Sequence, residues 1–275
     1  MACDAPAIVV RALHGAREYA ACVALQERTW GEGFAERVPA TILRIAQETG
    51  GIASGAFDET NRLLGFVFGM TGWVDRSPVH WSDMLAVSPE ARNCGVGTAL
   101  KLHQRDVLLA RGVEIMRWTF DPLQARNGYL NLSRLGAVAR EYARDYYEYS
   151  DSPLHAIIGT DRLIVTWELA SERVARRLDG REPPPGRDDV EHLPLLNPLL
   201  EEAPLECAHP HGIAGVAAVR IAVPTDINAI RTIDPERALR WRQRTRAPFE
   251  AALGKGFEVR ELVRAGEVGW YILVR

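Results

Sequence analysis

The chain has 275 residues, of which 47% are hydrophobic and 25% are charged. This is the composition of an ordinary globular protein, and it excludes a disordered tail, a collagen-like chain and a coiled-coil rod. The 33 basic and 36 acidic residues leave a net charge of −3, so no strong field draws the chain to nucleic acid or to an anionic membrane. At ~100–200 residues per domain, the length allows one large domain or two modest ones.

The first 170 residues alternate between strand-like and helix-like segments. Strands are expected at 8–12, 51–57, 63–73, 79–87, 114–120 and 163–169, and helices at 16–30, 39–49, 95–111 and 125–135. The residues between the second and third strands, Asp58 to Asn61, are typical of a hairpin turn. The pattern predicts a mixed α/β (α+β) domain over residues 1–170.

A proline-rich stretch follows this domain. Seven of the sixteen prolines lie between Pro183 and Pro210, which predicts a linker over residues 171–212. Beyond it, strands are expected at 216–223, 258–263 and 270–274. A helix is expected at 235–253, with a restart or a kink at Pro248. The sequence therefore predicts a small C-terminal α/β subdomain over residues 213–275.

The spacing of the cysteines and the length of the apolar runs indicate the cellular compartment of the protein. The four cysteines are far apart and form no CxxC pair, which favours a reduced, cytoplasmic protein. The sequence has no apolar run of the ~18 residues that a membrane-spanning helix needs. Its first six residues include an acid and a proline, which is atypical of a signal peptide. We therefore expect a cytoplasmic protein without membrane or nucleic-acid partners.

Closely spaced glycines follow the strand that ends at Val87. The segment from Arg92 to Gly97 (RNCGVG) leads directly into a helix, and Arg92 adds a positive charge. Backbone N–H groups in such a turn, together with the positive end of the helix, suit a phosphate or pyrophosphate. The dinucleotide pattern GxGxxG would need a third glycine at Leu100, and GxxxxGK[ST] does not occur. The alternative is that the glycines only begin the helix.

This segment resembles the acyl-CoA signature of the GNAT N-acyltransferase superfamily. The resemblance rests on Arg92-x-x-Gly95-x-Gly97, preceded by Leu85-Ala-Val87 and a Pro89-Glu90 turn, and on the order of elements over residues 8–170. Trp118 to Leu123, with Asn127 and Asn131, further resembles a predicted-acetyltransferase subgroup that carries a C-terminal extension. The resemblance implies a mixed, mostly antiparallel twisted sheet flanked by helices and splayed after the strand that ends near Val87.

The resemblance also implies acetyl-CoA, or another acyl-CoA, as co-substrate and no metal. The residues that would hold the CoA pyrophosphate are Arg92, Asn93, Cys94, Gly95, Val96, Gly97 and Thr98. The backbone of Leu85, Ala86 and Val87 would pair with the pantetheine arm, and one of its N–H groups would polarise the thioester carbonyl. Asn127 would lie near the pantetheine or its thiol end.

Transfer to an amine requires a proton acceptor, because a typical amine is largely protonated at neutral pH. Simple alternation places Trp81, Asp83, Leu85 and Val87 on one strand face, so Asp83 is the candidate base. The alternatives are a solvated or ion-paired aspartate, a relay through water, and the weaker candidates His80 and His103.

The proton donor to the leaving thiolate departs from the family pattern. The family's tyrosine at this step would fall at Leu132. Tyr129, one helical turn earlier, is the candidate replacement, although Tyr142, Tyr146, Tyr147 and Tyr149 follow it. Otherwise the thiolate leaves unassisted or the site has lost transferase activity.

Two other groups of residues carry weaker signals. Cys207, His209 and His211 are possible metal ligands, but no second pair stands at zinc-like spacing, which favours a polar loop. Five arginines between 237 and 246 flank Trp241. We expect a solvated helix face there, and the alternative is contact with CoA phosphates or a substrate carboxylate.

The sequence predicts a cytoplasmic N-acyltransferase that moves an acetyl or other short acyl group from CoA to the amine of a small molecule. One alternative is succinyl-type transfer to an amino acid. Another is a non-catalytic acyl-CoA-binding or sensor protein, which Leu132 and the lack of a clear base suggest. A homodimer is left open.

Overall fold

The computed structural model describes residues 8–147, 158–197, 213 and 215–275. These residues fall into two compact units that divide between Trp118 and Thr119. The predicted domain boundaries near residues 170 and 213 do not coincide with this division, and separate domains at those positions stay a prediction. In the described part of the chain, no helix has the length and apolar character needed to cross a membrane.

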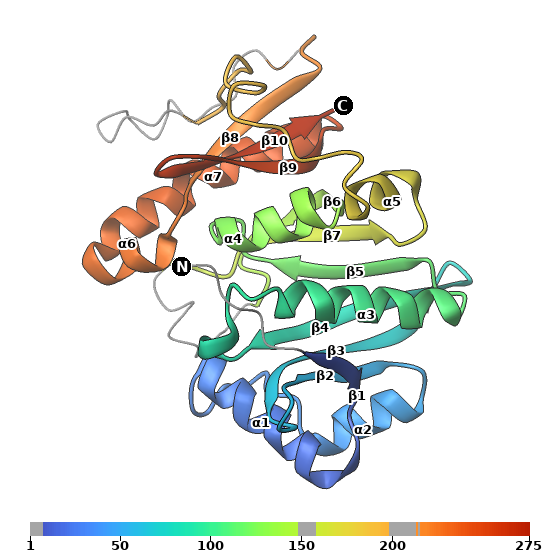
Figure 1. Ribbon diagram of the computed structural model, residues 1–275. Coiled ribbons are helices and arrows are strands. Elements are labelled where there is room, and N and C mark those ends of the chain that lie inside the picture. The colour runs from blue at the N-terminus through green and yellow to red at the C-terminus, as the bar shows by residue number, and fades with distance from the viewer. Residues whose placement is uncertain (1–7, 148–157, 198–212, 214) are drawn as a thin grey trace. The chain divides into compact units, whose positions relative to one another are not determined.

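The first unit is a sheet with helices on both faces (Figure 1). Its strands are β1 (Val9–Ala12), β2 (Ile52–Phe57), β3 (Leu63–Val74), β4 (Ser77–Val87) and β5 (Ile115–Phe120), the last two residues of β5 belonging to the second unit. Its helices are α1 (Gly15–Trp30), α2 (Ala40–Glu48), the 3₁₀ turn η1 (Pro89–Ala91) and α3 (Val96–Ala110). The strand order is β1-β2-β3-β4-β5, antiparallel except for the parallel pair β4–β5.

Alternate residues of β3 define the two faces of this sheet. Phe66 and Phe68 belong to a buried cluster with residues of α1 and α2, so we name this side the α1–α2 face. A side chain on Gly65 would instead lie 3.1 Å from Val96 and 3.2 Å from Leu100, both on α3. This second side is the α3 face. Because strand residues alternate between faces, each helix layer buries its own set of side chains.

An extra residue in β4 interrupts its alternation. Met84 pairs with Phe68 and Ser82 pairs with Gly69, which leaves Asp83 without a partner on β3. Such a β-bulge changes which residues face which side. The structure therefore contradicts the predicted simple alternation: Leu85 lies on the α3 face, whereas Trp81, directly opposite Met70, lies on the α1–α2 face.

The second unit contains a second set of antiparallel strands. They are β6 (Val138–Ala143), β7 (Arg162–Glu168), β8 (Ala218–Pro224), β9 (Glu258–Ala265) and β10 (Val268–Val274), in the order β7-β6-β9-β10-β8. Its helices are α4 (Ala125–Gly128), the π-helical stretch η2 (Tyr129–Arg134), α5 (Glu172–Leu178), α6 (Ile227–Ile233) and α7 (Pro235–Gly254).

The mixed α/β class with a mostly antiparallel sheet and flanking helices is confirmed. Several elements differ from the prediction. The segment expected as a linker contains α5, whose N-terminus is capped by Ser171 accepting from the Val174 N–H. The helix does not restart at Pro248, which lies inside the continuous element α7, and a kink there stays a prediction. The strands expected as a separate C-terminal subdomain share a sheet with β6, through the pair Ala139↔Val259.

Candidate active site

The end of β4 is hydrogen-bonded along one edge. Val87 pairs with Gly65 on β3, and the preceding residues continue this ladder. On the other edge, the pairs with β5 end at Trp81↔Arg117, and the described pairs include none from Ser82 onward. The backbone groups on that edge are therefore available to an extended ligand, which could pair with them as an added strand would.

The turn after β4 leads into the N-terminal end of α3. Asn93 (φ 68°) and Gly95 (φ 79°) adopt left-handed backbone conformations that turn the chain into α3. The first helical bond runs from the Ala99 N–H to the Gly95 carbonyl, at 2.9 Å. The N–H groups of residues 96–98, at the start of α3, precede this bond and have no acceptor within the helix, and their dipoles make this end positive. This is the geometry of an anion site.

The turn packs against the end of the strand. A side chain on Gly97 would lie 3.7 Å from Leu85 and 3.8 Å from Val87. Arg92 is exposed, and its Nε donates a hydrogen bond of 3.4 Å to the Val87 carbonyl. The residues predicted to hold the pantetheine arm and the pyrophosphate, 85–87 and 92–98, are thus close together in the first unit.

Asp83 is an exposed carboxylate in the bulge. Crowding by the surrounding protein raises its pKa above the usual range, and a hydrogen bond from the Trp81 side chain opposes this shift in part. A carboxylate with a raised pKa is a stronger base than an ordinary aspartate. Because Trp81 faces away from α3, this hydrogen bond places the Asp83 carboxylate beside a side chain on the α1–α2 face.

The two histidines weighed as alternatives have other partners. His80 is wholly buried, and its ring nitrogens lie 3.0 Å from Thr71 Oγ1 and 2.9 Å from Gln104 Nε2. Burial lowers the pKa of His80 to about 3, so it is neutral and has no free ring nitrogen for a substrate proton. His103 lies 3.1 Å from the Ser54 hydroxyl, and its pKa is lowered by burial.

A buried lysine lies on the α3 face beside the bulge, and sequence reasoning did not single it out. Lys101 donates a 2.7 Å hydrogen bond to Ser82, and its Nζ lies 3.9 Å from the centre of the Trp118 ring. Burial lowers the pKa of Lys101 to about 7. Ser82 in turn donates a 2.9 Å bond to Gln104, so this chain of polar groups ties β4 to α3.

The remaining predicted site residues belong to the second unit. Asn127 is exposed on α4, and Tyr129 is half-buried with the Arg264 guanidinium 4.9 Å from its ring centre. Leu132, at the position of the family's tyrosine, is wholly buried. Tyr142 donates to Asp161, which together with burial raises its pKa. Tyr149 lies outside the described residues.

The arginine-rich helix does not present a solvated face throughout. Arg242 on α7 is wholly buried, donates two 2.8 Å bonds to Asp121 and bonds the Ile158 carbonyl at 2.9 Å. Arg246 donates to both oxygens of Asp161, at 2.7 and 2.8 Å. These two arginines stabilise the second unit, whereas Arg240 is half-exposed.

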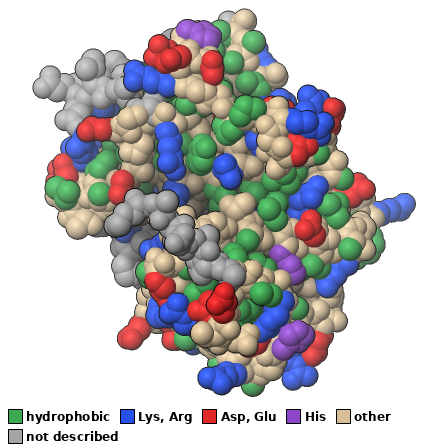
Figure 2. All heavy atoms as spheres, viewed as in Figure 1, with side chains coloured by type: hydrophobic (Ala, Val, Ile, Leu, Met, Phe, Trp, Pro, Cys, Tyr) green, Lys and Arg blue, Asp and Glu red, His purple; other side chains and the backbone are tan. Residues whose placement is uncertain are grey.

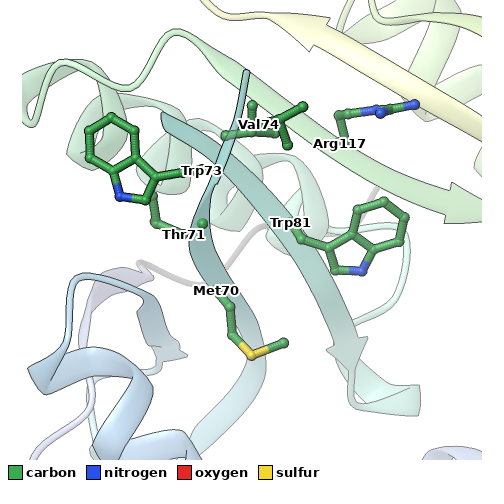
Figure 3. A pocket seen from close by; sticks show the side chains of 8 residues that line it. Met70, Thr71, Trp73, Val74, Trp81 and Arg117 are labelled. Carbon is green, nitrogen blue, oxygen red and sulfur yellow. The ribbon is translucent and has the colours of Figure 1, made fainter. Parts of the chain in front are cut away.

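A pocket of about 270 Å³ lies in the first unit, and sequence reasoning missed it. Figure 3 shows side chains from β3, β4 and β5 around it. The lining residues are Met70, Thr71, Gly72, Trp73, Val74, Val79, Trp81 and Arg117. The two tryptophans on either side of the β3–β4 turn were the available signal, but the contribution of Arg117 depends on the pairing of β4 with β5.

The described residues contain no group of three or more histidine, cysteine, aspartate or glutamate side chains that could hold a metal. Cys207, His209 and His211 lie outside them. On the face seen in Figure 2, basic and acidic side chains are interspersed.

Comparison with known proteins identifies the domain. Residues 19–130 match the model of the acetyltransferase (GNAT) family. No curated protein matches the sequence. The ribosomal-protein-S18-alanine N-acetyltransferase from Escherichia coli is 19% identical over 60% of this chain and 97% of that chain, with a TM-score of 0.46.

Two further solved structures are similar to a like extent. An acetyltransferase of the GNAT family from Streptococcus pneumoniae is 16% identical over 58% of this chain and 98% of that chain, with a TM-score of 0.47. A chain of the NatC complex bound to Gag peptide and CoA is 15% identical over 58% and 98%, with a TM-score of 0.47. Sequence identities and TM-scores as low as these assign no substrate to this chain. From the family match and the turn that follows β4, we conclude that the chain contains a domain of the acetyltransferase (GNAT) family.

Proposed function

We propose that this protein is an acyl-CoA-dependent N-acyltransferase that transfers an acetyl or other short acyl group to the amine of a small molecule. The observation that carries the proposal is the end of β4, which is open along one edge and leads through Arg92–Thr98 into the start of α3. A pantetheine arm would pair with Leu85–Val87 while its pyrophosphate meets the N–H groups of the turn and Arg92.

The chemistry is a direct transfer. The neutral amine nitrogen attacks the thioester carbonyl carbon, the new C–N bond forms, and the C–S bond breaks. A backbone N–H of Leu85–Val87 would donate to the carbonyl oxygen as it gains negative charge. Asp83, directly or through water, would take the proton that the amine loses. Tyr129 is the proposed donor to the departing thiolate, and Asn127 would contact the pantetheine.

A second candidate is a non-catalytic acyl-CoA-binding protein. The observation that favours it is the buried apolar side chain of Leu132 where the family places its tyrosine. In that case the CoA contacts stay as proposed, but no acceptor is turned over.

One experiment separates these functions. Release of free thiol is measured from acetyl-CoA and from succinyl-CoA against a panel of small amines, peptides and a carrier protein, and CoA affinity is measured by calorimetry. Turnover of acetyl-CoA with a small amine is expected. Preference for succinyl-CoA would show that the transferred group is succinyl and not acetyl. Preference for peptides would show that the acceptor is a peptide and not a small molecule. Tight CoA binding without turnover would support the sensor, and absence of CoA binding would overturn both functions.

The cytoplasmic location, the homodimer, the absence of a metal and membership of the subgroup with a C-terminal extension stay predictions.

A further inference from the structure

Three residues that line the pocket, Met70, Trp81 and Arg117, lie on the face of the sheet opposite α3, whereas Trp73 alternates to the α3 side. Trp81 pairs directly with Met70 on β3 and with Arg117 on β5. Their neighbour on β5, Met116, contacts Lys101 of α3, so Arg117 points to the other face. Met70, Trp81 and Arg117 therefore lie on the same face of three adjacent strands and line one pocket, and Figure 3 labels their side chains.

The walls of the pocket are apolar, and its one charged lining residue is a cation. Met70 is 46% exposed, which is a large value for an apolar side chain. Apolar side chains left open around a pocket mark a binding site for an apolar group. Arg117 is the only charged residue among those lining the pocket, and its planar guanidinium suits a carboxylate.

The pocket also lies in line with the proposed catalytic groups. Along β4, Val79 and Trp81 line the pocket, Asp83 follows, and Leu85–Val87 form the open edge. The Trp81 side chain, which lines the pocket, donates a hydrogen bond to the Asp83 carboxylate, so the two side chains are in contact. A compound with an apolar group on Trp81 would therefore need its amine only a short linker away to reach Asp83.

We infer that this pocket binds the acceptor, and that the acceptor is a small molecule with an apolar or aromatic side chain and a carboxylate close to its amine, as in a hydrophobic α-amino acid. The apolar group packs on Met70 and Trp81, the carboxylate meets Arg117, and the amine points toward Asp83. This inference rests on the proposed acyl transfer, which it narrows to one class of acceptor.

Four matched acceptors test the inference with acetyl-CoA as donor. Phenylalanine has all three groups, 2-phenylethylamine lacks the carboxylate, glycine lacks the ring, and phenylalaninamide lacks the charge. We expect phenylalanine to exceed each of the others in kcat/KM by at least about tenfold. Calorimetric titration of the CoA-loaded protein with the same four compounds gives a second readout that does not need turnover.

Two variants assign the selectivity to the pocket. Arg117→Gln should abolish the preference for phenylalanine over 2-phenylethylamine, and Trp81→Ala should abolish the preference over glycine. Both should leave the affinity for CoA unchanged. Arg117→Lys keeps the charge and Trp81→Phe keeps an aromatic ring, so each should retain part of the preference. These two variants provide the test if Arg117→Gln or Trp81→Ala folds poorly. Ile45→Ala removes an apolar side chain on α2 that is 52% exposed, and it is the matched control.

The outcomes separate this inference from the proposed function. Turnover or binding of amines without preference for ring or carboxylate would overturn the inference and leave the acyl transfer standing. Preference for phenylalanine that survives Arg117→Gln and Trp81→Ala would also overturn it. Loss of CoA binding in the wild-type protein would overturn the proposed function itself, whereas phenylalanine that binds selectively without turnover would support the pocket alone.

Discussion

Lys101 donates a hydrogen bond of 2.7 Å to the hydroxyl of Ser82, the residue that immediately precedes the unpaired Asp83 in β4. A buried ammonium group therefore supports the strand at the point where its alternation changes. Because burial lowers the pKa of this lysine to about 7, the charge on the group depends on pH in the neutral range.

Replacing Lys101 by methionine should change how stability depends on pH. The unfolded chain holds the lysine proton up to ~10.4, whereas the folded chain begins to lose it near pH 7. Between these values the unfolded state binds more protons, so the free energy of unfolding rises with pH. We expect the wild type to gain about 2 kcal/mol over Lys101→Met between pH 7 and pH 9 in urea unfolding. Lys255→Met, at an exposed lysine, should not alter the slope, and equal slopes for wild type and Lys101→Met would contradict the prediction.

Replacing Gly95 by aspartate should abolish CoA binding. The new carboxylate would stand where the turn meets the pyrophosphate, and we expect CoA affinity to fall at least about a hundredfold in calorimetry. Gly112→Asp is the matched control, because Gly112 lies at the other end of α3 with a similar left-handed φ (74° against 79°) and equally open surroundings. Unchanged affinity in folded Gly95→Asp would remove the pyrophosphate site from this turn.

Replacing Asp83 by asparagine should slow the transfer without weakening CoA binding. General-base catalysis contributes typically 10²–10⁴-fold, so kcat should fall by about that factor. The raised pKa of Asp83 predicts that wild-type kcat/KM declines as pH falls through that value, because the carboxylate becomes protonated. The variant should lack this decline. Asp106→Asn, on an exposed part of α3, serves as control, and a wild-type rate in Asp83→Asn would favour a relay through water.

Replacing Arg242 by methionine should destabilise the second unit. The change leaves Asp121 without its buried cation, whereas Asp161 keeps its two hydrogen bonds from Arg246. Removing one partner of a buried pair costs about 3–5 kcal/mol. The more exposed Arg240 lies 3.6 Å from Asp234, and Arg240→Met should cost at most about 1 kcal/mol. Denaturant unfolding measures both. A stable Arg242→Met protein with weakened CoA binding would instead support the alternative that this helix contacts the ligand.

Local patterns predicted the elements that form from short stretches of sequence. The helix after Gly95 and the strand that ends at Val87 have strong periodicity or clear turn residues, and both lie within a residue or two of their expected bounds. The Arg92–Gly97 turn was predicted because its closely spaced glycines are visible in the sequence, and Gly95 does adopt a left-handed conformation.

Long-range pairing explains the errors. The bulge at Asp83 depends on the register between β3 and β4, which the alternation of one strand does not reveal. The burial of Arg242 depends on Asp121, which precedes it by 121 residues. The pocket likewise combines residues of three strands, and Arg117 reaches it only because β5 runs parallel to β4.

The bulge in β4 would allow a single strand to serve both proposed ligands from opposite sides of the sheet. Leu85 and Val87 face α3, where the proposed CoA contacts lie, whereas Trp81 faces the pocket on the other side. If β4 alternated without interruption, Trp81 would share a face with Leu85 and Val87, and the acyl-CoA and the amine acceptor would then compete for the same surface. The extra residue would separate the two proposed ligands, and Asp83 would stand between them.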